Sequence, residues 1–277
     1  MPVAGQTLTP EDGLWINAPT TLGTAVVGGT TYAVLGAAGS DSLTVVEVGA
    51  GGTLTIRDHI LDARDTRFGG VTSLDIITVG AMTYVVAGGA DDGLSLFVLL
   101  DGGMLIPRAH IADTDRIGLQ NISAVALMAE ARAINIYAAS SAEIGVTHLR
   151  YDTGPPGLAL LADPSGGLLT GTAGADVLTG SAGSDIIARG AADDILRDGA
   201  GADQLTGGEG ADLFILSSDG AMDMSTDFEV DIDMIDLSLW PMLRDISQLW
   251  ISLRPDGMQI SYGDEVLIVQ SADKTPI

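Results

Sequence analysis

The chain has 277 residues, of which 37 are acidic and 12 are basic, so its formal charge at pH 7 is −25. A surface of this sign repels phosphate backbones and anionic lipid headgroups, which argues against nucleic acid and membrane surfaces as partners and favours divalent cations. Cysteine is absent, which excludes disulfides and thiolate metal sites.

The first residues, MPVAGQTLTPEDG, contain no basic segment followed by an apolar one, so no N-terminal signal peptide is expected. Charged residues interrupt every long apolar stretch, and Glu130 and Arg132 divide the most apolar of them. We therefore expect no segment that inserts in a membrane.

Residues 1–155 repeat a β pattern at intervals of about fifty residues. Thr31–Val34 returns as Thr83–Val86 and, more faintly, as Ala133–Ile136; a small-residue turn and an alternating strand follow each of them. The first two units share a closing strand, 57–62 in one and 108–113 in the other. Alternation of apolar and polar residues between frequent turns predicts antiparallel β-sheet.

A unit of this length with three or four strands resembles a propeller blade, although any three-fold β repeat has a similar pattern. Propellers typically close with four to eight blades, and the pattern supplies about three. Either a second chain or a docked partner completes the ring, or the domain is a three-sheet prism or trefoil. We therefore expect a homo-oligomer or a place in a larger assembly.

No catalytic residue and no residue for an organic cofactor is predicted. His59, His110 and His148 are the histidines of the chain, and none is spaced from a serine or carboxylate as in a known catalytic motif. The zinc-protease pattern HExxH and the hydrolase pattern GxSxG are both absent.

The segment 153–157, TGPPG, separates this half from a second half with a different sequence pattern. We place one domain at 1–155 and another at 158–277. Residues 1–150 hold 15 acidic and 7 basic residues, whereas residues 151–277 hold 22 and 5. The excess of negative charge in the second half points to a domain that depends on cations.

From Gly171 onward the chain consists of five successive nonapeptides. The sixth residue of each is aspartate: Asp176, Asp185, Asp194, Asp203 and Asp212. The eighth is large and apolar: Leu178, Ile187, Leu196, Leu205 and Phe214. The fourth is glycine in four of them: Gly174, Gly183, Gly201 and Gly210.

Each nonapeptide supplies a six-residue loop and a three-residue strand, so two of them make one turn of a parallel roll. Loops of alternate repeats then stack about 4.8 Å apart, which places their aspartates in two rows that repel one another unless a cation lies between them. Calcium accepts six to eight oxygen ligands, and glycine lets a loop adopt positive φ and turn carbonyls inward. We predict calcium at these five aspartates and four glycines.

This array resembles the RTX family, whose calcium-binding nonapeptides read G-G-x-G-x-D-x-U-x. The resemblance implies a β-roll at about 166–215 and a cap at 216–277, with a terminal hairpin formed by 249–253 and 258–269. It also implies export by a type I route and an extracellular or cell-surface location. Ordinary solvated turns are expected at the cap aspartates Asp227, Asp231, Asp233 and Asp236.

The third nonapeptide departs from the family pattern, with Arg189 at its first place and Ala192 at its fourth. Alanine resists the conformation that glycine adopts, and a guanidinium competes with a cation. We therefore expect a well-occupied calcium between the loops of Asp185 and Asp203 and weaker binding beside Asp194. Trp240 and Trp250 fall in the cap, and we expect both in its core.

The function predicted from these features is non-enzymatic. Calcium orders the roll outside the cell, and the N-terminal domain engages a surface polysaccharide or a partner protein as an adhesive or structural module. Two alternatives remain open: a receptor-binding spike or fibre of a phage-like particle, and a secreted propeller-type hydrolase or lactonase.

Overall fold

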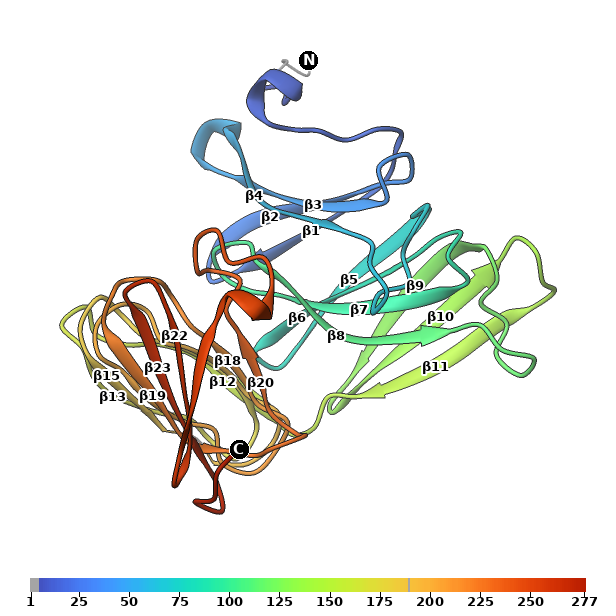
Figure 1. The fold of residues 1–277 in the computed structure, drawn as a ribbon. Helices are drawn as coiled ribbons and strands as arrows, with labels where there is room; N and C mark the ends of the chain where they lie inside the picture. The colour runs from blue at the N-terminus through green and yellow to red at the C-terminus, as the bar shows by residue number, and fades with distance from the viewer. Residues whose placement is uncertain (1–4, 189) are drawn as a thin grey trace. The chain divides into compact units, whose positions relative to one another are not determined.

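The computed structural model describes residues 5–188 and 190–277, and the chain divides into two compact units, Met1–Asp152 and Thr153–Ile277. Nearly all regular structure is β, as predicted (Figure 1). The helical segments among the described residues are single 3-10 turns, Pro10–Asp12, Ala50–Gly52 and Ile246–Gln248. None of the described helices has the length and apolar character needed to cross a membrane.

Three antiparallel sheets form the first unit. The first contains β1 (Pro19–Val27), β2 (Thr30–Ala37), β3 (Ser42–Val48) and β4 (Leu54–Leu61). The second contains β5 (Ser73–Val79), β6 (Met82–Gly88), β7 (Gly93–Leu99) and β8 (Leu105–Ala112). The third has three strands, β9 (Ile122–Glu130), β10 (Ala133–Ser140) and β11 (Val146–Asp152). Each repeat of about fifty residues in the sequence therefore folds into one sheet.

A recurring side-chain bond explains why the sheets follow one another in the same way. Asp41, in the turn between β2 and β3, accepts a hydrogen bond from the N–H of Gly70 at 2.6 Å. Its equivalent Asp92, between β6 and β7, accepts one from the N–H of Asn121 at 3.1 Å. Each aspartate thus ties the turn of one sheet to the segment that enters the next.

The first strands of the three sheets lie side by side (Figure 1). Thr21 on β1 accepts a hydrogen bond from the N–H of Leu74 at 3.3 Å, and Ser73 on β5 accepts one from the N–H of Val125 at 2.9 Å. A hydrophobic core lies between the first two sheets, where the rings of Phe68 and Phe97 meet edge to face. Three antiparallel sheets from three repeats agree with the predicted propeller-like or prism-like domain.

The second unit is a parallel roll followed by a cap. One sheet contains β12 (Pro156–Leu161), β14 (Ala175–Thr179), β16 (Ile195–Arg197), β18 (Leu213–Ile215) and β20 (Met234–Asp236). The other contains β13 (Gly167–Thr170), β15 (Asp185–Ala188), β17 (Gln204–Thr206) and β19 (Met222–Phe228). It continues into the cap strands β23 (Glu265–Ser271), β22 (Gly257–Tyr262) and β21 (Trp250–Arg254).

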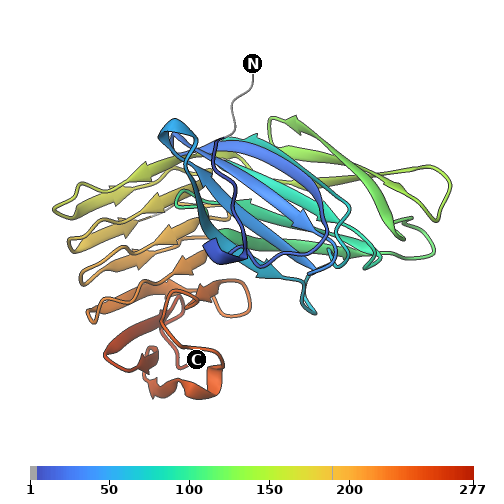
Figure 2. The same cartoon turned by 90° about the horizontal axis from the view of Figure 1, so that it is seen from above.

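The strand register confirms two nonapeptides per turn. The strands of the roll stack on one another (Figure 2). Leu178 lies opposite Leu196, and Leu196 lies opposite Phe214, in consecutive parallel strands of one sheet. The eighth residue of every nonapeptide is fully buried and contributes to a single apolar core. Because the loops carry little apolar surface, this column of side chains supplies the hydrophobic stabilisation of the roll.

The roll begins earlier than its aspartates indicate. Strands β12 and β13 pair in parallel with β14 and β15, so the first turn starts at Pro156 and not near 166. The first turn was missed because Leu158 and Gly167 occupy the places of its aspartates, opposite Asp176 and Asp185. Apolar residues still occupy the eighth places.

The cap differs from the predicted hairpin in two respects. The arm predicted at 258–269 is two strands, β22 and β23, joined by a turn at Gly263. Trp240 is buried and stacks on Tyr262, as expected, and its indole N–H donates to the carbonyl of Ser217 at 2.9 Å. The prediction for Trp250 was wrong: this side chain is 74% exposed, because β21 is the edge strand of its sheet.

Candidate metal centre

The sixth-place aspartates form two ladders along the two edges of the roll. On one edge, named here the Asp176 edge, Asp194 accepts a hydrogen bond from the N–H of Asp176 at 2.7 Å and Asp212 accepts one from the N–H of Asp194 at 2.9 Å. On the other, the Asp185 edge, Asp203 accepts one from the N–H of Asp185 at 2.6 Å. Each of these aspartates is at most 1% exposed.

Both ladders continue into the cap, which the nonapeptide spacing does not indicate. Asp223 accepts a hydrogen bond from the N–H of Asp203, and Asp233 accepts one from the N–H of Asp212, each at 3.0 Å. The expectation of a solvated turn at Asp233 was therefore wrong, since this side chain is 8% exposed. A detectable signal was present: both aspartates are followed directly by an apolar residue, as in four of the five nonapeptides.

On the Asp185 edge, Oδ1 of Asp185 and Oδ2 of Asp203 are buried and have no hydrogen-bond partner among the described residues. A buried oxygen without a partner is costly, and the stacked loops present carboxylate and carbonyl oxygens, the ligands that calcium takes in proteins. The residues of this edge therefore fit a calcium ion.

The fourth-place glycines are required for two different reasons. Gly201 and Gly210 have φ of 108° and 137°, as expected for loops that glycine alone forms easily. Gly174 and Gly183 do not adopt positive φ; instead a Cβ would lie 2.3 Å from the carbonyl oxygen of Pro156 and 2.5 Å from that of Ser165. In these two loops, glycine allows the stacked backbones to approach closely.

Ala192 adopts the conformation that it was expected to resist. Its φ is 80°, in the left-handed region, which costs an L-residue about 1–2 kcal/mol. The neighbouring loop helps to hold it, because Asp193 accepts a hydrogen bond from the N–H of Ala211 at 2.9 Å. Arg189, the other departure from the repeat, lies outside the described residues.

A cluster of three carboxylates lies where the Asp185 edge reaches the cap. It consists of Asp198, Asp203 and Asp223: one carboxylate oxygen from each lies within 4.8 Å of the other two, and the residues are at most 4% exposed. Burial raises the pKa of Asp198 to about 6 and the pKa of Asp203 and Asp223 to about 7, and repulsion from neighbouring carboxylates, Asp219 among them, adds to the effect in all three. Asp198 was not predicted as a ligand, because it occupies the first place of its nonapeptide and the predicted aspartate ligands occupy the sixth.

The other cap aspartates serve mainly to hold loops. Asp227 accepts hydrogen bonds from the N–H groups of Gly207 and Gly208, both at 2.9 Å. Asp236 accepts one from the N–H of Ser238, but it is the half-buried last residue of β20, so the expectation of a solvated turn there was wrong. Neither arrangement brings three carboxylates together.

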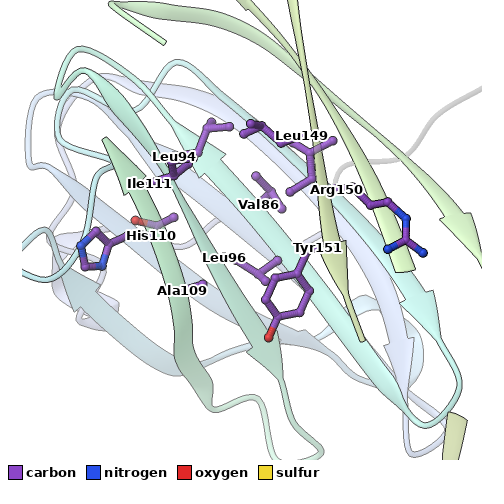
Figure 3. A pocket seen from close by; sticks show the side chains of 11 residues that line it. Val86, Leu94, Leu96, Ala109, His110, Ile111, Leu149, Arg150 and Tyr151 are labelled. Carbon is purple, nitrogen blue, oxygen red and sulfur yellow. The ribbon is translucent and has the colours of Figure 1, made fainter. Parts of the chain in front are cut away.

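The first unit contains a pocket of about 240 Å³ between its second and third sheets. Its wall is mostly apolar and includes Val86, Leu94, Leu96, Ile111 and Leu149. His110 and Arg150 lie at its sides, with the imidazole and guanidinium directed away from the apolar centre (Figure 3). The pocket can accept an apolar group and offers few polar contacts to hold it.

The histidines occupy cross-strand positions. His59 shares a hydrogen bond with Thr44 at 2.8 Å, and His148 shares one with Asn135 at 2.8 Å. The fold also pairs His110 with Ser95 across β7 and β8, a juxtaposition that the sequence analysis did not foresee. Ser95 is 1% exposed and its hydroxyl accepts a hydrogen bond from the N–H of Arg67 at 2.6 Å.

The nonapeptide array matches a known repeat family. The RTX calcium-binding nonapeptide repeat (four copies) matches residues 167–196 and 189–219. The C-terminal half therefore carries RTX repeats, which bind calcium, as the sequence predicts. Proteins with such repeats are typically secreted. No curated protein matches the chain.

Proposed function

We propose that this chain, whose C-terminal half carries RTX repeats, is a non-enzymatic extracellular protein that binds a partner when calcium has ordered its roll. Calcium occupies the stacked loops of Asp176, Asp185, Asp194, Asp203 and Asp212. The N-terminal unit then acts as an adhesive or structural binding module. Type I export delivers the chain, since calcium outside the cell is abundant enough for sites of modest affinity.

The observation that carries the calcium requirement is the pair of buried aspartate ladders. Carboxylates in adjacent turns lie one strand spacing apart, so their mutual repulsion destabilises the roll unless a cation neutralises it. The buried oxygens Oδ1 of Asp185 and Oδ2 of Asp203, which have no hydrogen-bond partner among the described residues, support an ion at this edge. Calcium binding and folding of the roll are therefore coupled.

The pocket in the N-terminal unit favours a protein partner over a polysaccharide. Its wall is built largely from Val86, Leu94, Leu96 and Leu149. Sugar hydroxyls need hydrogen-bonding groups, whereas an apolar side chain of a protein gains affinity when such a pocket removes it from water. An aliphatic or aromatic anchor residue is the occupant that fits this lining.

The sheets of the same unit favour assembly. Strand β11 is an edge of the three-stranded third sheet, and Leu22 and Val26 on β1 are 60% and 63% exposed. An open edge and an uncovered apolar face invite pairing with another chain. A homo-oligomer would cover both the open edge and the apolar face, and so would docking into the spike or fibre of a phage-like particle.

A hydrolase remains the second candidate because His110 and Ser95 are cross-strand partners in the pocket wall. The buried hydroxyl of Ser95 is already engaged by the N–H of Arg67. The equivalent pair in the first sheet is Thr44 and His59, so the placement follows from the repeat. These contacts favour a structural role for the pair.

One experiment tests the calcium-binding and assembly parts of this proposal together. Native mass spectrometry of the full chain during a calcium titration reports both bound ions and oligomeric state. We expect several calcium ions per chain and a complex larger than one chain. A monomer that binds no calcium at millimolar concentration would refute the proposal, whereas a calcium-loaded monomer would refute the assembly alone.

A further inference from the structure

In the second and fifth nonapeptides, the first-place glycine faces the sixth-place aspartate of the same repeat. A Cβ built on Gly207 would lie 2.2 Å from Oδ2 of Asp212, and one built on Gly180 would lie 3.1 Å from Oδ2 of Asp185. Glycine therefore keeps the space beside the ladder carboxylate clear. A side chain at this place must enter that space or displace the loop.

The fourth nonapeptide places a carboxylate there. Asp198 stands at its first place and is 2% exposed. One of its carboxylate oxygens lies within 4.8 Å of one oxygen of Asp203, from the same loop, and one of Asp223, from the cap. The three groups therefore come from two stacked loops. Asp198 and Asp203 occupy the first and sixth places of one nonapeptide, and Asp223 lies beyond the array.

The cluster is only partly satisfied by hydrogen bonds. Asp198 accepts from the N–H of Gly199 at 2.6 Å and from the N–H of Ser217 at 2.8 Å and 2.9 Å. Asp223 and Asp203 each accept one backbone N–H through Oδ1. Oδ2 of Asp203 is buried and has no partner among the described residues. Three adjacent carboxylates and an open acceptor call for a cation.

We propose that Asp198, Asp203 and Asp223 bind a calcium ion in a three-carboxylate site that fastens the roll to its cap. This site rests on the proposed calcium function and adds two ligands that the nonapeptide pattern does not contain. Because calcium affinity rises with the number of charged ligands, it is the tightest site of the chain. Asp223 lies in β19, which pairs with both β17 and β23, so the ion joins the array to the cap.

The test is a calcium titration of the full chain by calorimetry and native mass spectrometry, repeated with terbium as a luminescent probe. The key variant is Asp198→Gly, which restores the residue found at the first place of three other nonapeptides. The matched control is Asp163→Asn, which also removes one negative charge but alters an exposed side chain outside the cluster.

We expect Asp198→Gly to lose one ion or to weaken the tightest site about tenfold or more, with the remaining ions unchanged. Asp163→Asn should leave both quantities unchanged. If Asp198→Gly fails to fold in calcium, Asp198→Asn preserves the shape and removes the charge, and the same weakening is expected. Equal affinities and stoichiometries in wild type and both Asp198 variants would overturn the site while leaving the calcium function intact.

Discussion

The backbone N–H of Asp203 donates a hydrogen bond to Oδ1 of Asp223 at 3.0 Å. This bond has the same form as the bond between Asp185 and Asp203 one turn earlier, although 20 residues and not 18 separate the partners. The cap is therefore a continuation of the ladder. Calcium that orders the array should order the cap as well.

Calcium should control the folding of residues 153–277 and leave the first unit unchanged. Sites with submillimolar affinity each contribute about 1–2 kcal/mol in millimolar calcium by mass action. Hydrogen exchange with calcium and with chelator measures this directly. Protection of β14 to β20 should fall sharply with chelator, while β2, β6 and β10 keep theirs. Equal protection of the second unit in both conditions would contradict the prediction.

Without calcium, the second unit should be more stable at pH 5 than at pH 8. Burial raises the pKa of Asp203 and Asp223 to about 7 and that of Asp198 to about 6, above the value of about 4 in an unfolded chain. The folded state thus binds more protons, and its stability falls as the pH rises through 6 and 7.

Urea unfolding in calcium-free buffer, followed through the buried Trp240, tests the sign of this dependence. Saturating calcium is the control, because metal binding requires ionised carboxylates and should remove or reverse the advantage of low pH. A calcium-free protein that becomes more stable between pH 5 and pH 8 would show that these carboxylates do not dominate the pH dependence.

Ala192→Gly should stabilise the protein by about 1 kcal/mol, because it relieves a left-handed φ of 80°. The matched control is Ala191→Gly, one residue earlier and outside the left-handed region, which should destabilise by about 0.5–1 kcal/mol. Thermal unfolding in calcium compares the two. Equal effects of the two substitutions would mean that the loop releases its strain in solution.

Asp203→Asn should raise the calcium concentration needed for folding more than Asp194→Asn does. Asp203 contributes to a ladder and to the carboxylate cluster, whereas Asp194 contributes to a ladder alone. The midpoint of refolding against calcium, measured by circular dichroism, ranks the two variants. A larger shift for Asp194→Asn would reverse the ranking and would place the dominant ion on the Asp176 edge.

Replacing His59 or His148 by Gln should lower stability by about 1 kcal/mol at most, the usual net value of one hydrogen bond. His110→Gln should change stability less, since its imidazole is exposed. Thermal unfolding and a panel of ester, lactone and glycoside substrates are the measurements. Hydrolysis in the wild type that His110→Gln abolishes would establish the hydrolase candidate in place of the binding module.

The periodic part of the fold was predictable because its geometry is local. A nonapeptide holds one loop and one short strand, so the spacing of Asp176, Asp185 and Asp194 alone predicts two edges, and that of Leu178 and Ile187 predicts one core. The fifty-residue repeat predicted the sheets of the first unit in the same way. In both halves, the period of the sequence equals the period of the structure.

Only the tertiary structure determines the two ends of the roll, where the nine-residue period of the sequence stops. Parallel strands of the roll pair by contact between neighbouring turns, so a connecting loop can lengthen to bring Asp223 or Asp233 into register. The first turn keeps its strands although Leu158 and Gly167 replace the aspartates. Asp198 joins the cluster because the winding of the roll places the Asp198 loop against the cap. The nine-residue spacing does not extend to these contacts, because packing between turns sets them.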